Sequence, residues 1–522
     1  MKKGFTLIEL LAVILILGII ALIAIPTVNN ILKEARRGAF LSTLTNLKKV
    51  VEEQCTMEQI KNVEITTSYT ISSGIIFPNL EIKGDLPDGT IEVNSSCEVA
   101  FLLSNNNFTG TKDFVGDIVI TDGSTNVSSG YKEAILNGAD PVITGNLVPV
   151  TIDSDGTVRK ANINEKWYSY EEKMWANAVI LTNTGKIESN GIILENSIES
   201  YFVWIPRYKY KIFDTGNYTS ILNETPSSRN KKPIEIVFEN KSTSASMGNN
   251  IDQYLTHPAF VSFDTNGFWV AKFETGGTTE SVLIKPNQTS LRSLNVKTMF
   301  EIAYNYKRNN DSHMMKNTEW GAVAYLTLSN YGVNQELNIN NNSNYLTGYA
   351  AHESTNQSQN PGTYGTDSSL TVLYNTSAGY RASTTGNITG IYDMSGGANE
   401  YMASFVDGSL GNSGFESDPT ITYGNKYFDK YASDCNASSY NKRILGDATG
   451  EIGPFYYYAD YDGTLRNHSN WYKNTANFAA PATPWFTKGG YYMGGSGSGI
   501  LNFDRSSGKN YTNTGFRIVL GS

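Results

Sequence analysis

The sequence predicts an α+β protein in which one long N-terminal helix precedes a series of small, loop-rich sheets. Three observations support this prediction. A helical pattern covers residues 5–58, runs of β-forming residues separated by turns follow, and the chain contains 47 Gly, 32 Tyr and 22 Phe. Only 17% of the residues are charged. This composition is typical of an extracellular protein with many loops and aromatic surfaces.

The first element is an apolar run over residues 5–25, in which Glu9 is the only charged residue. At about 1.5 Å per residue, a helix of this length is long enough to cross the hydrocarbon core of a bilayer. Lys2 and Lys3 precede the run. The positive-inside rule therefore places the N-terminus in the cytoplasm and the rest of the chain outside.

Glu9 does not suit a simple membrane anchor, because an unpaired carboxylate inside a membrane costs several kcal/mol and needs a partner. The α-amino group of a neighbouring subunit could be that partner if the chain began at Phe5. The segment Gly4-Phe-Thr-Leu-Ile-Glu9, preceded by a short basic leader, resembles the N-terminus of type IV prepilins. The alternative is a signal-anchor helix with a chance Glu. A secretory signal is excluded because no small-x-small cleavage site follows the apolar run.

The prepilin resemblance implies a specific processing pathway. A membrane prepilin peptidase would remove residues 1–4 by cleaving between Gly4 and Phe5, and the new amine of Phe5 would be methylated. Glu9 would pair with that amine when the subunit assembles with other pilin subunits. The protein would then be a single-pass protein of the cytoplasmic membrane before assembly and part of a cell-surface pilus afterwards.

Length, charge and cysteine content narrow the remaining possibilities. A chain of 522 residues suggests three or more domains. The net charge of −9 gives no support to a nucleic-acid-binding surface, so no nucleic-acid partner is expected. The three cysteines cannot all pair within one chain. A bridge from Cys55 in the helix to Cys97 in the following strands is possible and would leave Cys435 alone.

Beyond Pro26 the helical pattern becomes amphipathic, with apolar residues recurring at gaps of three and four as far as Val51. Pro26 should kink this helix without ending it. Residues 59–146 are predicted to form an antiparallel pilin head sheet on the C-terminal half of the helix. The strand signals in this region are residues 65–71, 89–94, 99–103 and 117–121.

A domain boundary is expected near Leu147, and residues 147–200 are predicted to form a connecting region. Its first part, residues 147–158, has the pattern of a β-hairpin closed by Ser154-Asp-Gly156. Aromatic residues become dense from Trp167 onward, which indicates the beginning of a packed core.

Five segments of the C-terminal region carry a second resemblance. They are Phe202-Val-Trp-Ile-Pro-Arg207, Gly267-Phe-Trp-Val-Ala-Lys-Phe-Glu274, Thr318-Glu-Trp-Gly-Ala-Val-Ala-Tyr325, Gly390-Ile-Tyr-Asp-Met-Ser-Gly-Gly-Ala-Asn-Glu400 and Gly515-Phe-Arg-Ile-Val519. Their order is similar to that of the formylglycine-generating (sulfatase-modifying factor) family, a branch of the C-type-lectin fold. The resemblance implies a mixed, loop-rich C-type-lectin-like domain over residues 201–522.

Enzyme activity is not expected, although the resembled family contains oxidases. Those enzymes use a pair of cysteines near the C-terminus that binds copper, and thiolates are the ligands that copper(I) prefers. No cysteine follows Cys435 in this chain, so the pair is missing. The four histidines are scattered and form no recognisable catalytic motif.

The Gly-rich stretch from Asp393 to Glu400 suggests a calcium site, because carboxylates and backbone carbonyls are the hard oxygen ligands that suit Ca²⁺. In the resembled family the corresponding positions hold a structural calcium ion. The implied ligands are the side chains of Asp393 and Glu400 and the carbonyls of Gly396 and Ala398. The alternative is a polar turn whose carboxylates are solvated.

The last segment of the chain suggests a ligand-binding surface. Trp485, Ile500, Phe503 and Phe516 have the pattern of core residues. Residues of the types that form adaptable binding surfaces are interleaved with them. These are Tyr491, Tyr492, Ser496, Ser498, Asn502, Asp504, Arg505, Asn510, Tyr511 and Asn513. The segment is similar to the ligand-binding surface of lectin-fold proteins diversified by retroelements. The alternative is an ordinary Gly-rich loop region.

The sequence therefore predicts a minor type IV pilin at the filament tip that acts as a surface adhesin. Its expected partners are other pilin subunits, the prepilin peptidase, the membrane before assembly and an extracellular glycan or protein. A pseudopilin of a secretion or DNA-uptake system is the second hypothesis, because it would share the whole N-terminus. A membrane-anchored enzyme is the third.

Overall fold

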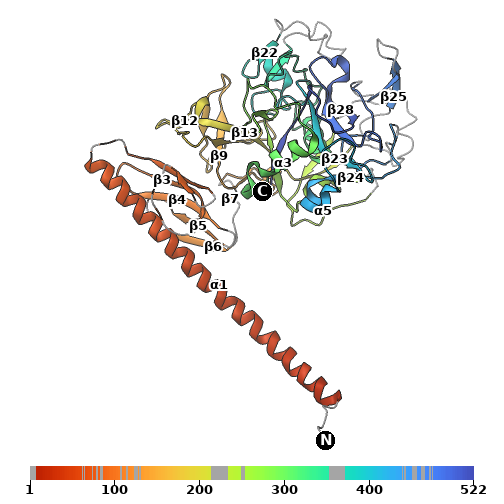
Figure 1. Ribbon diagram of the computed structural model, residues 1–522. Coiled ribbons are helices and arrows are strands. Elements are labelled where there is room, and N and C mark those ends of the chain that lie inside the picture. Colours follow the sequence, from red (N-terminus) through yellow and green to blue (C-terminus); the bar gives the residue numbers. More distant parts are fainter. Residues whose placement is uncertain are drawn as a thin grey trace. The chain divides into compact units, whose positions relative to one another are not determined.

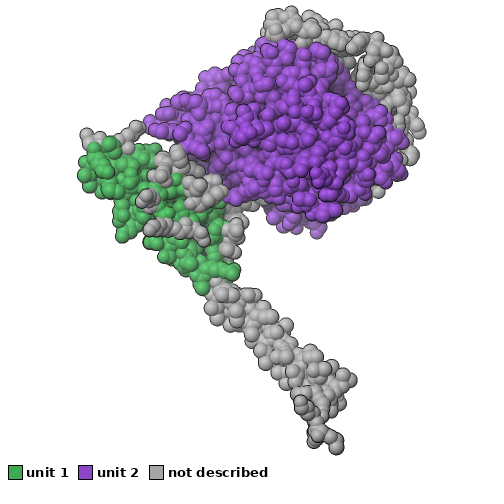
Figure 2. Space-filling view, in the orientation of Figure 1, with its two compact units in different colours: residues 1–125 green, residues 126–522 purple. Residues whose placement is uncertain are grey.

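The computed structural model contains two compact units, residues 1–125 and residues 126–522 (Figure 2). The structure describes residues 7–61, 63, 65–72, 75–77, 80, 82, 86–105, 108–112, 114, 116–122, 127–128, 131–212, 233–248, 253–351, 371–437, 439, 442–449, 455–459, 465–469, 472 and 474–521. It contains helices and several antiparallel sheets, which confirms the predicted α+β class.

Unit 1 combines the long helix α1 (Leu7–Ile60) with one antiparallel sheet (Figure 1). The helix continues through Pro26, as predicted. The strand order is β2-β1-β3-β4-β5-β6. The strands are β1 (Ser68–Ser72), β2 (Ile75–Phe77), β3 (Asp88–Val93), β4 (Val99–Ser104), β5 (Phe108–Lys112) and β6 (Val119–Asp122).

One face of α1 packs on the sheet. The buried residues of this face are Phe40, Leu44, Leu47, Val51 and Cys55, which follow one another at gaps of three or four. Burial of Leu44, Leu47 and Val51 confirms the predicted apolar face. Ala35 and Ala39 continue this face at similar spacing but are exposed, so burial of the apolar face begins at Phe40.

Strand β5 contacts the helix closely at Gly110. A Cβ atom added at this position would lie 2.1 Å from Leu44 Cδ1. Only glycine therefore allows β5 to lie against α1 without moving Leu44. The sequence analysis did not predict this strand, and the glycine that interrupts its β pattern has a packing role.

The disulfide between Cys55 and Cys97 links α1 to the turn between β3 and β4. The sequence analysis gave this bridge as the possible one. Cys435 is a buried free cysteine, as expected for the third one.

The predicted processing site lies largely outside the described residues. Gly4 and Phe5 are not described, and Glu9 lies on α1 at a position whose side chain is not described. Where the structure describes side chains, no helix is both long enough and apolar enough to cross a membrane. The side chains of the predicted span, residues 5–25, are not described.

Two larger sheets form the centre of unit 2. The first has the order β12-β10-β9-β11-β13-β17-β30-β20, and the second has the order β24-β23-β27-β28, with β29 also paired to β23. The first contains β9 (Leu147–Ile152), β10 (Val158–Lys160), β11 (Asn177–Leu181), β12 (Ile192–Ile193), β13 (Ile198–Pro206), β17 (Gly267–Ala271), β20 (His313–Met314) and β30 (Ile518–Leu520). The second contains β23 (Asn399–Val406), β24 (Asp429–Tyr431), β27 (Trp485–Gly489), β28 (Gly499–Ser506) and β29 (Thr514–Phe516).

Smaller elements surround these sheets. The helices are α2 (Pro258–Val261), α3 (Val296–Tyr306), α4 (Asn317–Thr327) and α5 (Pro419–Tyr423). The remaining strands are β7 (Val127–Ser128), β8 (Val142–Ile143), β14 (Tyr208–Lys211), β15 (Glu235–Phe238), β16 (Leu255–Thr256), β18 (Gly276–Gly277), β19 (Val282–Leu283), β21 (Tyr349–Ala351), β22 (Thr371–Leu373), β25 (Phe455–Ala459) and β26 (Leu465–Ser469).

The division between the units differs from the expected boundary near Leu147, because residues 126–146 already belong to unit 2. Residues 147–200, which the sequence predicts as a connecting region, contribute β9 to β12 to the first sheet, where β11 pairs with both β9 and β13. The predicted hairpin is confirmed, since β9 pairs antiparallel with β10.

The C-terminus joins the two sheets of unit 2. β29 pairs with β23 in the second sheet, whereas β30 pairs with β17 and β20 in the first. Arg517 is the single residue between β29 and β30. The five segments that carried the second resemblance lie on β13, β17, α4, β23 with its preceding loop, and β29 to β30. The C-type-lectin-like assignment of residues 201–522 stays a prediction.

Candidate functional site

The loop that leads into β23 is held in an unusual backbone conformation. Asp393, Gly396 and Gly397 all have positive φ angles, of 61°, 78° and 68°. A Cβ atom at Gly396 would lie 2.3 Å from Ile339, and one at Gly397 would lie 2.4 Å from Glu274 Oε1. The two glycines therefore allow the loop to pack tightly, which buries the carboxylates at both of its ends.

Asp393 is one of these carboxylates, and N–H donors surround it. Its Oδ1 accepts hydrogen bonds from Asn340 Nδ2 at 2.8 Å and from the backbone N of Gly348 at 2.9 Å. Its Oδ2 accepts a longer one, 3.4 Å, from the backbone N of Glu274. Only 1% of Asp393 is exposed, and burial raises the pKa of its carboxyl.

Glu400 forms an ion pair with Arg517. Arg517 Nε donates to Oε2 at 2.9 Å, and Nη2 donates to Oε1 at 2.5 Å. Both residues are fully buried. The guanidinium also donates to the carbonyls of Ala271 and Tyr392, at 2.8 and 3.1 Å. Arg517 therefore holds together β23, β17 and the Asp393 loop.

Glu274 adds a third buried carboxyl group. Its Oε1 accepts a hydrogen bond from the backbone N of Ala398 at 2.9 Å, and its Oε2 contacts Ser290 Oγ. Burial, together with the negative charges of Asp393 and Glu400, raises the pKa of Glu274 well above its usual value. We call these three carboxyl groups and Arg517 the acidic centre.

Ser290 supports Glu274 in the acidic centre. Ser290 Oγ donates to Glu274 Oε2 and also lies 3.2 Å from the carbonyl of Tyr345. A hydroxyl has one hydrogen, so the two oxygens compete for it. The raised pKa of Glu274 means that its carboxyl keeps a proton to a higher pH than an ordinary glutamate does.

The predicted calcium ligands do not fit a calcium ion in this arrangement. N–H donors take up the carboxylates of Asp393 and Glu400, and the cation beside Glu400 is the guanidinium of Arg517. Within the described residues, no group of three or more His, Cys, Asp or Glu could hold a metal ion. The alternative, a polar turn with solvated carboxylates, is wrong because both carboxylates are buried. The hydrogen bonding therefore conflicts with the calcium site that the sequence predicts, and the chelation experiment described below decides between them.

A cluster of aromatic rings lies beside the loop. The backbone N of Tyr492 donates to the carbonyl of Gly397 at 3.0 Å. The Tyr492 ring meets the rings of Tyr345 and Tyr491 edge to face, at centroid distances of 4.9 and 5.9 Å. The guanidinium carbon of Arg292 lies 3.8 Å from the centroid of the Tyr345 ring. We call Tyr345, Tyr491, Tyr492 and Arg292, all partly exposed, the tyrosine surface.

Arg292 also connects this surface to the turn before β29. It donates to the carbonyl of Thr512, and the backbone N of the next residue, Ser293, donates to the carbonyl of Tyr511 at 3.1 Å. The structure thus brings Tyr491 and Tyr492 together with the predicted residues near Tyr511. The sequence analysis missed Arg292 and Tyr345, because each lies more than a hundred residues away from the segment that it contacts.

The other predicted surface residues differ in exposure. Ser498 and Asn502 are buried, so they are not part of the exposed surface, and their contact with a ligand stays a prediction. The Ser498 hydroxyl donates to the carbonyl of Tyr491 at 2.9 Å, and the Asn502 amide donates to that of Gly497 at 2.6 Å, so both support the loop. The side chain of Ser496 lies outside the described part. The exposed or partly exposed residues are Asp504, Arg505, Asn510, Tyr511 and Asn513.

The predicted core residues of the same segment are confirmed. Trp485, Ile500, Phe503 and Phe516 are fully buried. Trp485 stacks on Phe405 and Phe415, at centroid distances of 5.1 and 5.7 Å. The segment therefore alternates between a fixed core and exposed side chains.

Comparison with known protein families identifies the N-terminus. Residues 1–25 match the family described as the prokaryotic N-terminal methylation motif, the motif of type IV prepilin-like proteins. Gly4, Phe5 and Glu9 all lie within the matched residues. The motif indicates a type IV pilin-like or pseudopilin-like protein that assembles with other pilins after processing by a prepilin peptidase. It is also consistent with a membrane-anchored precursor.

The raised pKa of Glu274 leads to a prediction about stability. The carboxyl has a higher pKa in the folded protein than in the unfolded chain, where it is about 4.5, so the folded protein binds the proton more tightly. The stability of the fold therefore decreases as the pH rises from about 4.5 through the pKa of the folded state. Glu274→Gln should remove this fall, because a glutamine amide donates to Ser290 at any pH. We expect the Tm at pH 8 to rise by roughly 2–4 °C.

Thermal unfolding between pH 4.5 and 8 tests this prediction. Glu165→Gln, at an exposed position, is the matched control and should behave like the wild type. A Glu274→Gln protein that melts lower than the wild type at pH 8, with the same dependence on pH, would show that Glu274 is ionised in the folded state.

Calcium is tested by chelation and elemental analysis. We expect EGTA to change the Tm by less than about 1 °C, because Arg517 and the N–H donors already satisfy Asp393 and Glu400. Stoichiometric calcium in the purified protein, together with a clear loss of stability in EGTA, would instead establish the calcium site that the sequence predicts.

Proposed function

We propose that this protein is a minor type IV pilin located at the filament tip, where unit 2 binds an extracellular ligand. The observation that carries the proposal is the methylation motif over residues 1–25, which begins the same chain that forms the large unit 2. The motif supplies the means of assembly. The head supplies a surface for binding.

Unit 1 supports the assembly step. The apolar face of α1 is buried against its own sheet from Phe40 onward, whereas residues 33–39 are exposed or partly exposed and reach the sheet through Arg37, which donates to the carbonyl of Ile120 at 2.9 Å. We propose that neighbouring subunits contact the helix in its part before Phe40. The disulfide Cys55–Cys97 holds the other end of α1 to the sheet.

The size of unit 2 supports a position at the tip. Residues 126–522 form a head much larger than unit 1. In the shaft of a thin filament, every repeat would have to accommodate such a head. A single copy at the tip avoids this constraint.

The tyrosine surface supports ligand binding. Tyrosine rings offer a large contact area and lose little conformational entropy on binding, and arginine adds a charged, planar donor. The surface is supported by the buried acidic centre, which fixes the loop to which Tyr492 is bonded. We therefore propose that a glycan or protein ligand contacts Tyr491, Tyr492 and Tyr511.

The alternatives differ in what they require. A pseudopilin of a secretion or DNA-uptake system is equally compatible with the motif, and it would be favoured if loss of the gene blocked export or transformation and left adhesion intact. We propose that the protein is not an enzyme of the copper oxidase type. Burial raises the pKa of the Cys435 thiol to about 11, which makes it a poor nucleophile and a poor metal ligand at neutral pH.

Assembly is tested at Glu9. We expect Glu9→Ala to leave cleavage after Gly4 largely intact but to reduce the amount of this protein in filaments at least about tenfold, because a buried charge pair is lost. Mass spectrometry of the N-terminus and blotting of sheared filaments give the two measurements. Glu53→Ala, at an exposed position in the part of the same helix that packs on its own sheet, is the control. A wild-type chain that still begins at Met1 would refute the pilin proposal.

Ligand binding is tested on glycan and protein arrays with the intact, detergent-solubilised protein. A variant with Tyr491, Tyr492 and Tyr511 changed to Ala should bind at least about tenfold more weakly than the wild type, because stacking area is lost. Tyr254→Ala, a partly exposed tyrosine outside the tyrosine surface, should bind normally. If the triple variant binds as well as the wild type, the tyrosine surface is not the binding site.

A further inference from the structure

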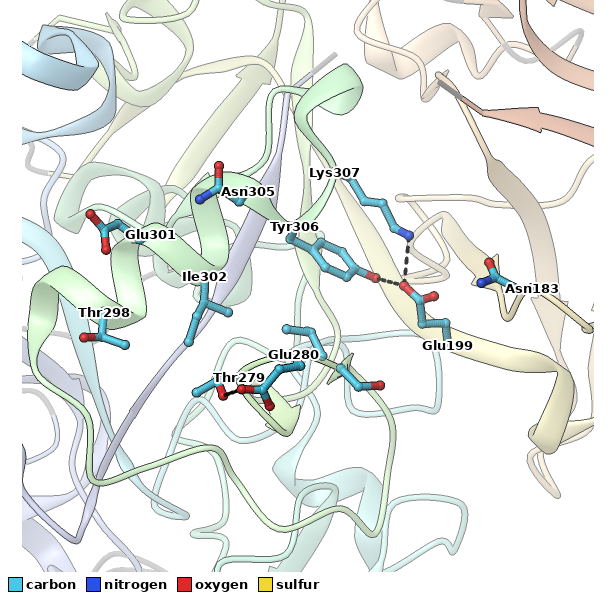
Figure 3. A pocket seen from close by; sticks show the side chains of 12 residues that line it. Asn183, Glu199, Thr279, Glu280, Thr298, Glu301, Ile302, Asn305, Tyr306 and Lys307 are labelled. Atoms are coloured by element: carbon cyan, nitrogen blue, oxygen red, sulfur yellow. Dashed lines mark hydrogen bonds and ion pairs between the residues drawn. The ribbon is translucent and has the colours of Figure 1, made fainter. Parts of the chain in front are cut away.

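We propose that a second site on unit 2, a polar pocket separate from the tyrosine surface, binds a ligand through an alkylammonium group (Figure 3). The pocket has a volume of about 540 Å³, within the range of small-molecule sites. Its lining residues are Asn183, Glu199, Thr279, Glu280, Ser281, Val282, Thr298, Glu301, Ile302, Asn305, Tyr306 and Lys307. None of them belongs to the tyrosine surface.

Two elements of regular structure form facing walls of the pocket. Helix α3 contributes residues at positions 298, 301, 302 and 305, which share one helix face because they are three or four residues apart. Asn295 caps this helix by accepting a hydrogen bond from the backbone N of Thr298. The turn of the β18–β19 hairpin contributes the other wall. The pocket is therefore built on a capped helix and a paired hairpin.

The charges of the lining favour a cation. The lining contains three carboxylates and one ammonium group. Glu199 is compensated within the pocket, because Lys307 Nζ lies 3.1 Å from its Oε1 and the Tyr306 hydroxyl donates to the same oxygen at 2.7 Å. Glu280 and Glu301 therefore supply the excess negative charge.

Neither of these two carboxylates has a close cationic partner in the described parts of the chain. Glu301 accepts a hydrogen bond from the Tyr423 hydroxyl at 2.9 Å, and Lys297 lies 4.0 Å away in a partly exposed pair. Such pairs contribute little. Glu280 accepts a hydrogen bond from Thr279 Oγ1 at 2.6 Å, and this bond lowers the pKa of its carboxyl. Both carboxylates can therefore receive the N–H groups of a ligand.

Apolar groups in the same pocket favour an alkyl chain next to the charge. Val282 and Ile302 are partly buried lining residues. In Figure 3 Ile302 lies between Glu301 and Glu280. An alkylammonium group would place its methylene groups on these side chains and its N–H donors on a carboxylate. A neutral ligand would desolvate the carboxylates without compensating their charge, which is unfavourable.

Lysine side chains and polyamines share this chemistry, and titration calorimetry can distinguish them. The probes are cadaverine and Nα-acetyl-lysine methylamide, with Nα-acetyl-norleucine methylamide as the neutral analogue, added to the intact, detergent-solubilised protein at low salt. We expect at least one cationic probe to bind, the neutral analogue not to bind, and added salt to weaken binding. Tighter binding of the lysine derivative indicates a protein ligand, and tighter binding of cadaverine indicates a polyamine.

Variants locate the site. Glu280→Gln and Glu301→Gln should each weaken binding about tenfold, the effect of losing one charge-assisted hydrogen bond. Glu165→Gln removes an exposed carboxylate outside the pocket and should have no effect. The proposal is overturned if neither cationic probe binds at about 10 mM, if the norleucine derivative binds equally well, or if the pocket variants bind like the wild type. The binding activity of the tyrosine surface is measured separately, so these outcomes do not decide it.

Discussion

The ion pair between Arg517 and Glu400 is the interaction on which unit 2 depends. Arg517 is the single residue between a strand of the first sheet and a strand of the second, and its guanidinium is completely buried. A buried charge is tolerated only when it is paired and hydrogen-bonded, and removal of one partner costs about 3–5 kcal/mol. Here the pair and two backbone carbonyls satisfy the guanidinium. The C-terminus is thereby fixed to both sheets.

The same pair determines the position of the tyrosine surface. Glu400 anchors one end of the Asp393 loop, and the Gly396–Gly397 turn brings the loop against Glu274. From there, hydrogen bonds lead through Ser290 to the backbone of Tyr345 and from Gly397 to Tyr492. The exposed rings therefore lie on a rigid, buried base. Exposed side chains can change on such a base with little effect on the fold, a useful property for a binding surface.

Local sequence patterns predicted the elements whose structure is decided locally. The buried face of α1, the strands β3 and β4 and the β9–β10 hairpin follow from periodicity and turn residues. Strand β5 was not predicted because Gly110 interrupts its β pattern. A glycine is needed there because the strand contacts Leu44, which is distant in sequence. Arg517, Arg292 and Tyr345 acquire their roles from partners more than fifty residues away, and Glu274 is held by Ala398, which is 124 residues away. Periodicity contains no information about such contacts. The pairing of β11 with β9 and β13 was not predicted for the same reason, because β13 follows β11 only after an intervening segment of the chain.

The two units have separate hydrophobic cores, and this separation matters for the proposed function. Among the described residues, the core of unit 1 lies between Phe40 and Ile120, that of unit 2 begins at Leu136, and no residue belongs to both. Substitutions at sites that share no partners have nearly additive effects on stability. Changes at the proposed binding surfaces of unit 2 are therefore expected to leave the packing of α1 on its sheet unaffected. On the proposed function, such a subunit could alter what it binds without altering the helix that assembles it, because none of the described core residues is shared between the two cores.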